Sequence, residues 1–565
     1  MFRNRPVARA QDDPARLSPA APWRTVKQAG LVLLCLAWVA LGLVGRDPWK
    51  TEDAITFAVG WEMLQRQDWL VPHVAQEVAF SEPPLVPWLS AATLALFAPP
   101  LDAADAGRLA VGVLLIALLA FTALAGRELN GRTMRWVPVL LVVGSVGLFD
   151  RAHQLSADLG LTVAVVVALY AVALALRRPR AGGIALGAAT AASFLAAGWL
   201  GPLWTLVPAL LLPWFGSAWR SRAYAVTLAI AMAVALPLAG WWPAAVAMRD
   251  PALFDAWRAA EGVADYFPFL PGSGAPAPGW VLKNLLWFAW PSVPLIAWAA
   301  WIRARGFNGG FATPGVVVPA VFAGWMLLML LAMPDQRLMQ LLPLCAPLAL
   351  LASLEVDTLK RGNSAALDWF GILTFGLVAI ALWAFWIDAY VNGMSARVAI
   401  LLRDSETGYG TSFRLRAVVA ALFLTALWIA LVRPARRSNR RTVLNWAAGM
   451  TLVWGLSATI WLPYVDARRT YQAVGETLGV YRPYDDCIVR RDVGLAQRAL
   501  FYHFVGLVTV AESAPEAARC QTLLVQYGRL PEGTPALPGH TIVWEGSRRG
   551  DASERYVLYR KASPR

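Results

Sequence analysis

Charged side chains are scarce in this chain. Only 15% of its 565 residues are Asp, Glu, Lys or Arg, whereas 58% are hydrophobic. Soluble domains carry about a quarter charged residues, so this composition excludes an ordinary soluble globular protein. The net charge of +14 would suggest nucleic acid in a soluble protein, but here the Arg residues stand in short clusters between apolar runs. That arrangement encodes membrane topology, and we exclude nucleic acid as a partner.

Motifs for metals and nucleotides are missing as well. The chain has four His residues, and none stands at a zinc-ligand spacing from a Cys or an acid. It has no G-x-x-x-x-G-K-[ST] loop and no dinucleotide-binding fingerprint. We therefore expect no metal site and no obligate cofactor, and the sequence supports neither ATP-driven transport nor nicotinamide chemistry.

Long apolar runs dominate the remaining sequence. A membrane helix needs about 20 predominantly apolar residues, and about thirteen such spans can be placed. The 28 Trp and 38 Pro residues suit interfacial belts and interrupted membrane helices. We predict a polytopic α-helical membrane protein, with spans near residues 28–45, 104–125, 136–150, 158–177, 183–200, 203–217, 224–247, 281–302, 315–333, 340–356, 370–388, 415–432 and 446–463.

Basic clusters divide the loops between these spans into two sets. One set contains the N-terminus, and the positive-inside rule places it in the cytoplasm. The other set contains the first loop, residues 46–103, and, because the span number is odd, everything after about residue 464. The basic clusters of the first set lie near residues 127–135, 177–180, 220–222, 303–305, 360–361 and 433–441.

The C-terminal region differs from the rest of the chain. The segments CIVRRDVG, TLLVQYG, HTIVWEG and RYVLYRK alternate apolar and polar residues, and a helical stretch occupies residues 495–505. We predict a small periplasmic α/β domain there. The chain then divides into a basic cytoplasmic N-terminus (1–27), a transmembrane domain (28–463) and this C-terminal domain (464–565).

The four cysteines fall into two pairs. Cys35 and Cys345 lie in apolar runs and are expected to be inert. Cys487 and Cys520 lie in the C-terminal domain, where an oxidising compartment would allow a disulfide that stabilises it by about 3–4 kcal/mol. Two buried free thiols are the alternative, because sequence alone does not fix the pairing.

The first outer loop opens with a predicted amphipathic helix. Thr51 can cap a helix that begins at Glu52, and Ile55, Val59 and Met63 recur on one face. We expect this helix to lie along the membrane surface. Its first turn therefore displays two acids on the aqueous side of the lipid boundary.

These two acids, Glu52 and Asp53, follow Lys50 directly. On the residues alone, they either complement the helix dipole or provide a general base beside a cation. Two further groups lie on the same predicted face: Asp150, Arg151, His153 and Asp158 after the third span, and the cations Lys283 and Arg337. Asp158 could instead cap the next helix, and the cations could be interfacial anchors rather than phosphate ligands.

Taken together, these residues resemble a family. The chain is similar to the lipid-linked-sugar glycosyltransferases of the GT-C fold, in the bacterial branch related to protein O-mannosyltransferases and to the aminoarabinose transferase that modifies lipid A. The family's first outer loop begins a helix with Pro-Asp-Glu-Ala and later carries Met-Leu, Gly-Asp-Trp, Val-Pro-His and Phe-Glu-Lys-Pro-Pro-Leu. The matching segments are TEDA at 51–54, ML at 63–64, DW at 68–69, VPH at 71–73 and FSEPPL at 80–85.

The resemblance implies roles for particular residues. The family's base is the first acid of its Asp-Glu pair, which falls on Glu52, but the two acids are inverted here and Asp53 stays a candidate. A partner acid falls on Asp158. The family's lysine before the double proline is replaced by Glu82, and its Lys-Gly-Pro appears as Leu200–Pro202 without the lysine. Donor phosphate would then be held by Lys50, Arg151, Lys283 and Arg337, and substrate by His73, Glu82 and His153.

The implied activity is transfer of a sugar from a polyprenyl-phosphate donor to a lipid, envelope-glycan or protein acceptor, with inversion at the sugar. The resemblance also implies a monomer in the bacterial inner membrane, in contact with membrane lipids. Two alternatives stay open. A lipid or polyprenyl-phosphate flippase would place acids and arginines in mid-span. A catalytically inactive relative would bind a lipid or a partner only.

Overall fold

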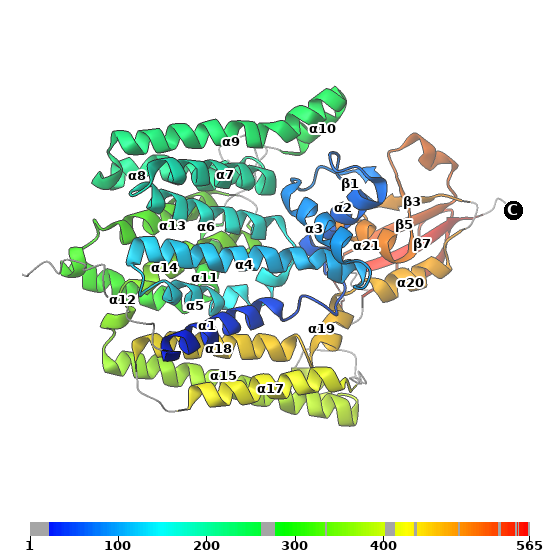
Figure 1. The fold of residues 1–565 in the computed structure, drawn as a ribbon. Coiled ribbons are helices and arrows are strands. Elements are labelled where there is room, and N and C mark those ends of the chain that lie inside the picture. The colour runs from blue at the N-terminus through cyan, green and yellow to red at the C-terminus, as the bar shows by residue number, and fades with distance from the viewer. Residues whose placement is uncertain are drawn as a thin grey trace, which may run out of the picture.

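The structure is a computed structural model that describes residues 22–261, 277–333, 336–401, 413–433, 438–483, 486–528, 533–548, 551 and 553–562. Helices form one long bundle, and the C-terminal strands form a sheet at one end of it (Figure 1). Most of the predicted basic N-terminus lies outside the described residues, which begin with α1 (Pro22–Ala40).

Seven described helices are long and apolar enough to cross a membrane, or ten spans result if each bent helix pair counts as one. Shorter apolar helices occupy Gln28–Ala40, Leu85–Phe97, Leu200–Phe215 and Leu338–Ser353. The total of about thirteen spans therefore stays a prediction. The seven long helices are α4 (Ala103–Asn130), α6 (Ala157–Ala175), α7 (Pro179–Ala197), α9 (Arg222–Arg249), α13 (Pro314–Ala332), α15 (Arg361–Asn392) and α17 (Leu415–Val432).

Three predicted spans contain a sharp bend. Proline explains one of them: α11 (Pro278–Phe288) and α12 (Ser292–Ala304) meet at 93° across Pro291, which lacks the N–H that would continue the first helix. The other two bends separate α5 (Trp136–Val143) from Val146–His153 by 60°, and α18 (Asn439–Ser457) from α19 (Leu462–Arg469) by 68°. The remaining short segments of the bundle are α3 (Leu85–Phe97), α8 (Leu200–Phe215), α10 (Pro251–Ala260), η6 (Leu338–Leu344), α14 (Cys345–Ser353) and α16 (Ala396–Leu401).

Helix α6 forms the centre of the bundle. It is apolar on all sides, and 72% of its most apolar stretch is buried inside the protein, as expected for a helix with neighbours all round. Helix α7 packs closely between α6 and α9 because it presents glycines: a Cβ at Gly187 would lie 2.5 Å from the carbonyl oxygen of Ala231. Helices α9, α15 and α17 are peripheral, with only 22%, 22% and 11% buried.

The C-terminal region forms a five-stranded sheet in the order β4-β3-β5-β7-β6. Strand β3 is parallel to β4 and β5, and β7 is antiparallel to β5 and β6. The four longer strands and the helix α21 (Leu495–Val505) fall in the predicted segments, whereas the short β4 was missed. The strands are β3 (Ile488–Arg491), β4 (Val510–Ala511), β5 (Thr522–Tyr527), β6 (His540–Gly546) and β7 (Arg555–Lys561).

Two features stabilise this sheet from within the C-terminal region. Cys487 and Cys520 form a disulfide between the residues that precede β3 and β5. Helices α20 (Gln472–Val480) and α21 supply the core with Leu478, Leu500 and Phe501. The predicted boundary at residue 463 falls inside α19, so a continuous helix leads from the bundle towards the sheet.

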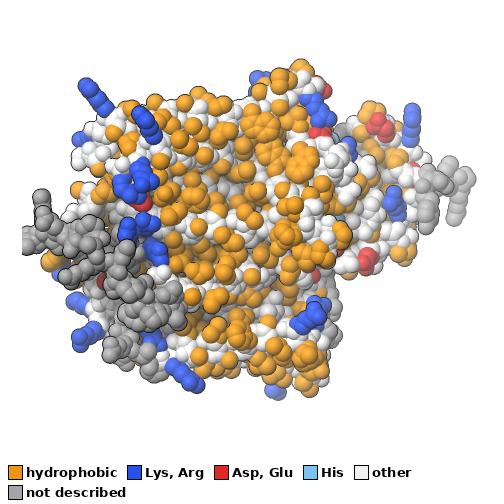
Figure 2. Space-filling view, in the orientation of Figure 1, with side chains coloured by type: hydrophobic (Ala, Val, Ile, Leu, Met, Phe, Trp, Pro, Cys, Tyr) orange, Lys and Arg blue, Asp and Glu red, His pale blue; other side chains and the backbone are white. Residues whose placement is uncertain are grey.

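Loops of the same predicted side contact one another at one end of the bundle. The Arg177 guanidinium pairs with Glu128 at 2.7 Å. Arg440 pairs with Asp357 at 2.5 Å and donates to the carbonyl oxygen of Thr133 at 2.9 Å. Figure 2 shows many Lys and Arg side chains at this end, away from the sheet, and a broad apolar surface between the two ends.

Candidate active site

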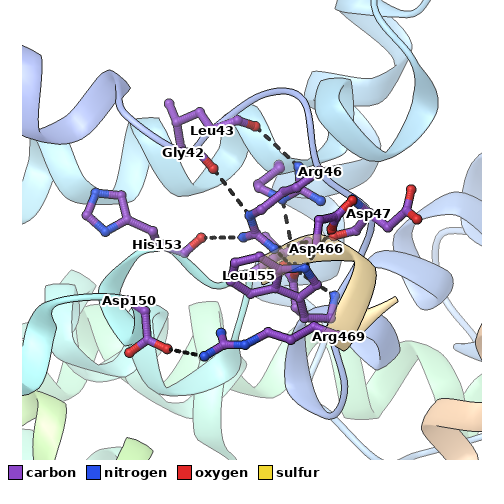
Figure 3. A network of polar contacts seen from close by, with 12 residues as sticks. Gly42, Leu43, Arg46, Asp47, Asp150, His153, Leu155, Asp466 and Arg469 are labelled. Atoms are coloured by element: carbon purple, nitrogen blue, oxygen red, sulfur yellow. Dashed lines mark hydrogen bonds and ion pairs between the residues drawn. The ribbon is translucent and has the colours of Figure 1, made fainter. Parts of the chain in front are cut away.

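The opposite end of the bundle carries the first outer loop, which begins with a fully enclosed ion pair. Asp53 is 1% exposed and Arg46 is 4% exposed, and Nη1 of Arg46 lies 2.7 Å from Oδ2 of Asp53. The same carboxylate accepts the backbone N–H groups of Trp49 at 3.0 Å and Leu155 at 2.9 Å. Arg46 also donates to the carbonyl oxygen of His153 at 2.8 Å (Figure 3).

The electrostatics of this pair fix the state of Asp53. Burial by itself would raise the pKa of the Asp53 carboxyl. The charges of Arg46 and Arg108 outweigh burial and lower the pKa of Asp53 below its ordinary value. Asp53 is thus ionised, enclosed and hydrogen-bonded on both oxygens, so it has no oxygen to offer an acceptor. It anchors the loop to the residues after α5, and this geometry favours Glu52 over Asp53 as the candidate base.

The segment between α1 and α2 is also tied to α19. The backbone N–H of Asp47 and the indole N–H of Trp49 both donate to Oδ1 of Asp466, at 3.1 and 2.8 Å. The guanidinium of Arg469 stacks 4.4 Å from the centroid of the Trp49 ring. Figure 3 shows Asp466 and Arg469 reaching this segment from α19. The helix α2 (Glu52–Arg66) therefore starts at a fixed position.

Glu52 lies one residue earlier than Asp53, and its side chain points in a different direction. Successive helical residues point about 100° apart, so the two acids cannot share an environment. Glu52 keeps 21% of its side chain exposed and lies 3.6 Å from Nη1 of Arg337, measured from its Oε1. Thr51 occupies the N-cap position as predicted, but its side chain makes no capping hydrogen bond.

Two further carboxyl groups lie near Glu52. Glu82 accepts a hydrogen bond from the Thr56 hydroxyl at 2.5 Å. Burial raises the pKa of Glu82 to about 8; the Thr56 hydrogen bond opposes the rise, and the charges of Glu52 and Asp158 add to it. Asp158 does not cap α6, since that role belongs to Ser156, whose hydroxyl accepts the N–H of Leu159 at 3.3 Å.

We call Glu52, Glu82 and Asp158 the carboxyl cluster. The Arg337 guanidinium interacts with this cluster, because its positive charge partly offsets the rise in the pKa of Glu82. The residues come from four separate segments: the start of α2, the loop before α3, the start of α6 and the start of η6. Among the described residues, no group of three or more His, Cys, Asp and Glu is placed to hold a metal ion.

A cavity of about 400 Å³ opens beside Glu52. Four of its lining side chains are cations and two are carboxylates, so we call it the basic cavity. Its cations are paired: Lys50 Nζ lies 2.8 Å from Glu554 and Arg469 lies 3.1 Å from Asp150. The lining residues are Lys50, Thr51, Glu52, Asp150, Arg151, Gln154, Met339, Arg469 and Arg548.

Glu554 is the contact between the C-terminal sheet and this cavity. Its carboxylate is 4% exposed and binds Lys50 at 2.8 Å, Arg548 at 2.7 Å and the Tyr471 hydroxyl. Burial by itself would raise the pKa of Glu554, but the hydrogen bonds from Lys50 and Tyr471 and the charge of Arg548 lower it to about 2.

The C-terminal region also covers α2. The stripe Ile55, Val59 and Met63 packs in one apolar cluster with Ala499 of α21 and Val74 of β1 (His73–Val74). The stripe therefore contacts protein, and the position of α2 along the membrane surface stays a prediction. β1 pairs with β2 (Glu77–Val78) in a short hairpin.

Two curated relatives of this chain share one description. The undecaprenyl phosphate-alpha-4-amino-4-deoxy-L-arabinose arabinosyl transferase of Edwardsiella ictaluri (strain 93-146) is 27% identical over 372 residues, which cover 62% of this chain and 64% of the relative. The protein of the same description from Pseudomonas savastanoi pv. phaseolicola (strain 1448A / Race 6) is 27% identical over 361 residues, covering 60% and 62%. The match thus spans less than two thirds of each of these relatives. No family model matches.

The decisive likeness is structural. The crystal structure of ArnT from Cupriavidus metallidurans bound to undecaprenyl phosphate covers 97% of this chain and 100% of its own, with a TM-score of 0.64 and 16% identity. The chain has the GT-C fold. The apo state of the same ArnT gives a TM-score of 0.63 over the same share of both chains. The predicted GT-C fold is therefore confirmed over 97% of the chain.

Within this GT-C fold, the predicted site residues separate into two groups. Glu52, Glu82, Asp158 and Arg337 come together, and Lys50 and Arg151 line the adjacent cavity. His153 does not reach either place, because it is fully buried between Trp38 and Trp454. Its Nε2 hydrogen-bonds the carbonyl oxygen of Trp38 at 2.8 Å. This burial does not support its predicted role in substrate binding.

His73 and Lys283 also lie apart from the basic cavity. His73 is 9% exposed in β1, and its Nδ1 hydrogen-bonds the carbonyl oxygen of Val71 at 2.9 Å. Lys283 is exposed on α11, and neither residue lines the cavity. The sequence analysis missed Arg469 and Arg548, because they belong to no motif and reach the cavity only when α19 and the C-terminal sheet fold against the first loop.

Proposed function

We propose that this protein transfers a sugar from a polyprenyl-phosphate donor to an acceptor on the outer face of the membrane, with Glu52 as the general base. The observation that carries the proposal is the separation of the two acids at the start of α2. Glu52 faces the basic cavity beside Arg337, while Asp53 is locked by Arg46. The named activity of the sequence relatives supports the same chemistry.

In the proposed reaction, the Glu52 carboxylate removes a proton from the hydroxyl or amine of the acceptor. The nucleophile's electron pair forms the new bond to the anomeric carbon, on the face opposite the phosphate. The bond between the anomeric carbon and the phosphate oxygen breaks, and its electron pair stays on the phosphate. A positioned base of this kind contributes about 10²- to 10⁴-fold.

The leaving phosphate needs positive charge rather than a proton donor. Arg337 lies beside Glu52, and Lys50 and Arg151 line the neighbouring cavity together with Arg469 and Arg548. Preorganised cations of this kind stabilise charge that develops in the transition state. We propose that they replace the two lysines that the family has and this chain lacks.

We also propose the orientation. The basic end of the bundle faces the cytoplasm of a bacterial inner membrane under the positive-inside rule, and the sheet is periplasmic. The Cys487–Cys520 disulfide fits an oxidising compartment. The chain is proposed to act as a monomer with membrane lipids, polyprenyl phosphate and a lipid, glycan or protein acceptor as its partners.

The flippase alternative is less well supported. Such a protein should carry ionisable side chains in mid-span along the lipid path. Here, the ion pairs of the described residues gather at the two ends of the bundle, for instance Arg303 with Glu355 at one end and Arg46 with Asp53 at the other.

The proposal is tested with the purified full chain in liposomes. Undecaprenyl phosphate-linked aminoarabinose is the first donor, because that sugar stands in the relatives' names, and a panel of other undecaprenyl phosphate sugars follows. Extracted envelope lipids and glycans serve as acceptors. Mass spectrometry is expected to find a product heavier by one sugar residue, together with free undecaprenyl phosphate.

The test variant is Arg337→Gln, which removes the guanidinium beside Glu52 and should slow donor consumption. Donor consumption at the wild-type rate in this variant would contradict the assigned phosphate site. Movement of the donor between the leaflets is measured with a fluorescent donor and a quencher added outside the liposomes. Movement of intact donor without any cleavage would support the flippase instead.

A further inference from the structure

A second cavity, of about 550 Å³, lies at the basic end of the bundle between α12 and the start of α15. It lies apart from the carboxyl cluster and from the basic cavity, with which it shares no lining residue. Its wall is made largely of aromatic and aliphatic side chains. The main apolar contributors are Trp290, Leu295, Trp298, Trp301, Leu367 and Phe370.

Two cations flank the ring of Trp301 at one side of this groove. The Arg305 guanidinium carbon lies 3.9 Å from the ring centroid, and the Lys360 ammonium lies 5.8 Å from it. Both are exposed. The aromatic ring thus holds two positive charges at the edge of an apolar surface.

These two charges lack the counter-ions that their neighbours have. Arg303, two residues before Arg305, pairs with the buried Glu355 at 2.9 Å. Asp357, three residues before Lys360, forms an ion pair with Arg440 instead. Among the residues that the structure describes, no carboxylate forms an ion pair with Arg305 or Lys360. The net charge at this edge of the groove is therefore positive.

We propose that the groove binds one anionic phospholipid. Its acyl chain lies against the apolar wall between α12 and α15, and its phosphate lies between Arg305 and Lys360. Basic pockets between membrane helices on the cytoplasmic side suit anionic head groups, because each Lys or Arg near the surface attracts them. A zwitterionic head group would bring its own cation into this positive edge and gain less.

The proposal does not depend on the transferase activity. It requires only that the groove is in the membrane and that its charged edge is at a head-group layer. Arg305 directly follows α12 and Lys360 directly precedes α15, and Figure 2 shows Lys and Arg side chains gathered at the end of the bundle away from the sheet. An occupied groove would brace α12 against α15, which otherwise face each other across it.

Native mass spectrometry of the full chain in detergent tests the site. Phosphatidylglycerol and phosphatidylethanolamine with identical acyl chains are titrated separately. We expect one phosphatidylglycerol to bind with clear preference. Replacing both cations, as Arg305→Gln with Lys360→Gln, should weaken it by about 25- to 30-fold, since each is worth about a factor of five.

The matched control removes two exposed cations at the same end but away from the groove, as Arg178→Gln with Arg180→Gln, and should leave binding unchanged. A second variant, Ala366→Phe, fills the groove from the exposed face of α15 and should weaken both lipids. Glycerol phosphate, which has the head-group charge but no chain, should not compete. Equal affinity for the two lipids, or wild-type binding in either groove variant, would overturn the proposal.

Discussion

Replacing Asp53 by Asn should destabilise the protein rather than remove a catalytic group. The amide keeps the size of the side chain and can still accept one backbone N–H, from Trp49 or Leu155. It removes the negative charge that lies 2.7 Å from Arg46. Removing one partner of a buried ion pair costs about 3–5 kcal/mol, because the remaining charge is left buried without compensation.

Two features of the structure place Asp53→Asn near the upper part of that range. Both members of the pair are enclosed, and a second cation, Arg108, lies 3.9 Å from the same carboxylate. The neutral variant would leave Arg46 and Arg108 to repel each other. Arg46 keeps its hydrogen bond to the carbonyl oxygen of His153, which limits the loss.

Thermal unfolding followed by size-exclusion chromatography in detergent measures this effect. Asp53→Asn should lower the unfolding midpoint clearly, while the exposed Asp255→Asn on α10 should not. Below its unfolding midpoint, the surviving folded fraction of Asp53→Asn should transfer sugar. A variant that is as stable as the wild-type protein yet inactive would refute the structural role of Asp53.

Three further predictions follow from single contacts. Glu82 has a raised pKa of about 8 in the folded protein, so its contribution to stability is present at acid pH. Stability should fall as the pH rises from about 4.5 to 8, by at most about 1.4 kcal/mol per pH unit. Glu82→Gln should flatten this slope when the thermal midpoint is measured over a series of pH values. Glu554 has a lowered pKa of about 2, so its stabilisation holds above about pH 4.5 and is lost towards pH 2. Glu554→Gln should cost about 2–3 kcal/mol at pH 7. It should also increase the stabilisation by inorganic phosphate, because Lys50 loses its counter-ion and Arg548 keeps only Asp551; equal phosphate stabilisation in both proteins would contradict this. Replacing both disulfide cysteines, as Cys487→Ser with Cys520→Ser, should destabilise the C-terminal sheet by about 3–4 kcal/mol, measured by limited proteolysis, and an unchanged cleavage rate would show that the disulfide adds nothing.

Local sequence patterns predicted the elements whose structure depends on local physics. The start of α2 at Glu52 and the helix α21 are where the capping and apolar periodicity placed them. The four longer strands follow from period-two alternation in the C-terminal region. The positions of the broken spans were less visible: Pro291 is a readable signal, but the other two bends depend on how the helices pack.

Contacts between distant segments explain what the sequence left open. The choice between Glu52 and Asp53 could not be made from the residues, since it depends on Arg46 and Arg108 reaching one of them. Likewise, the stripe on α2 predicts an apolar face but not what covers it, and α21 is more than 400 residues away in the chain, as the separation of Gln76 and Tyr502 by 426 illustrates.

The most direct test of the proposed mechanism is the rate of sugar transfer by Glu52→Gln. The variant keeps the shape of the side chain and loses only the base, so its unfolding midpoint should match that of the wild-type protein and of Glu476→Gln, an exposed control on α20. Its transfer rate from the polyprenyl-phosphate donor should fall by about 10²- to 10⁴-fold, with donor binding retained. A stable Glu52→Gln variant that transfers sugar at the wild-type rate would contradict the assignment of Glu52 as the base.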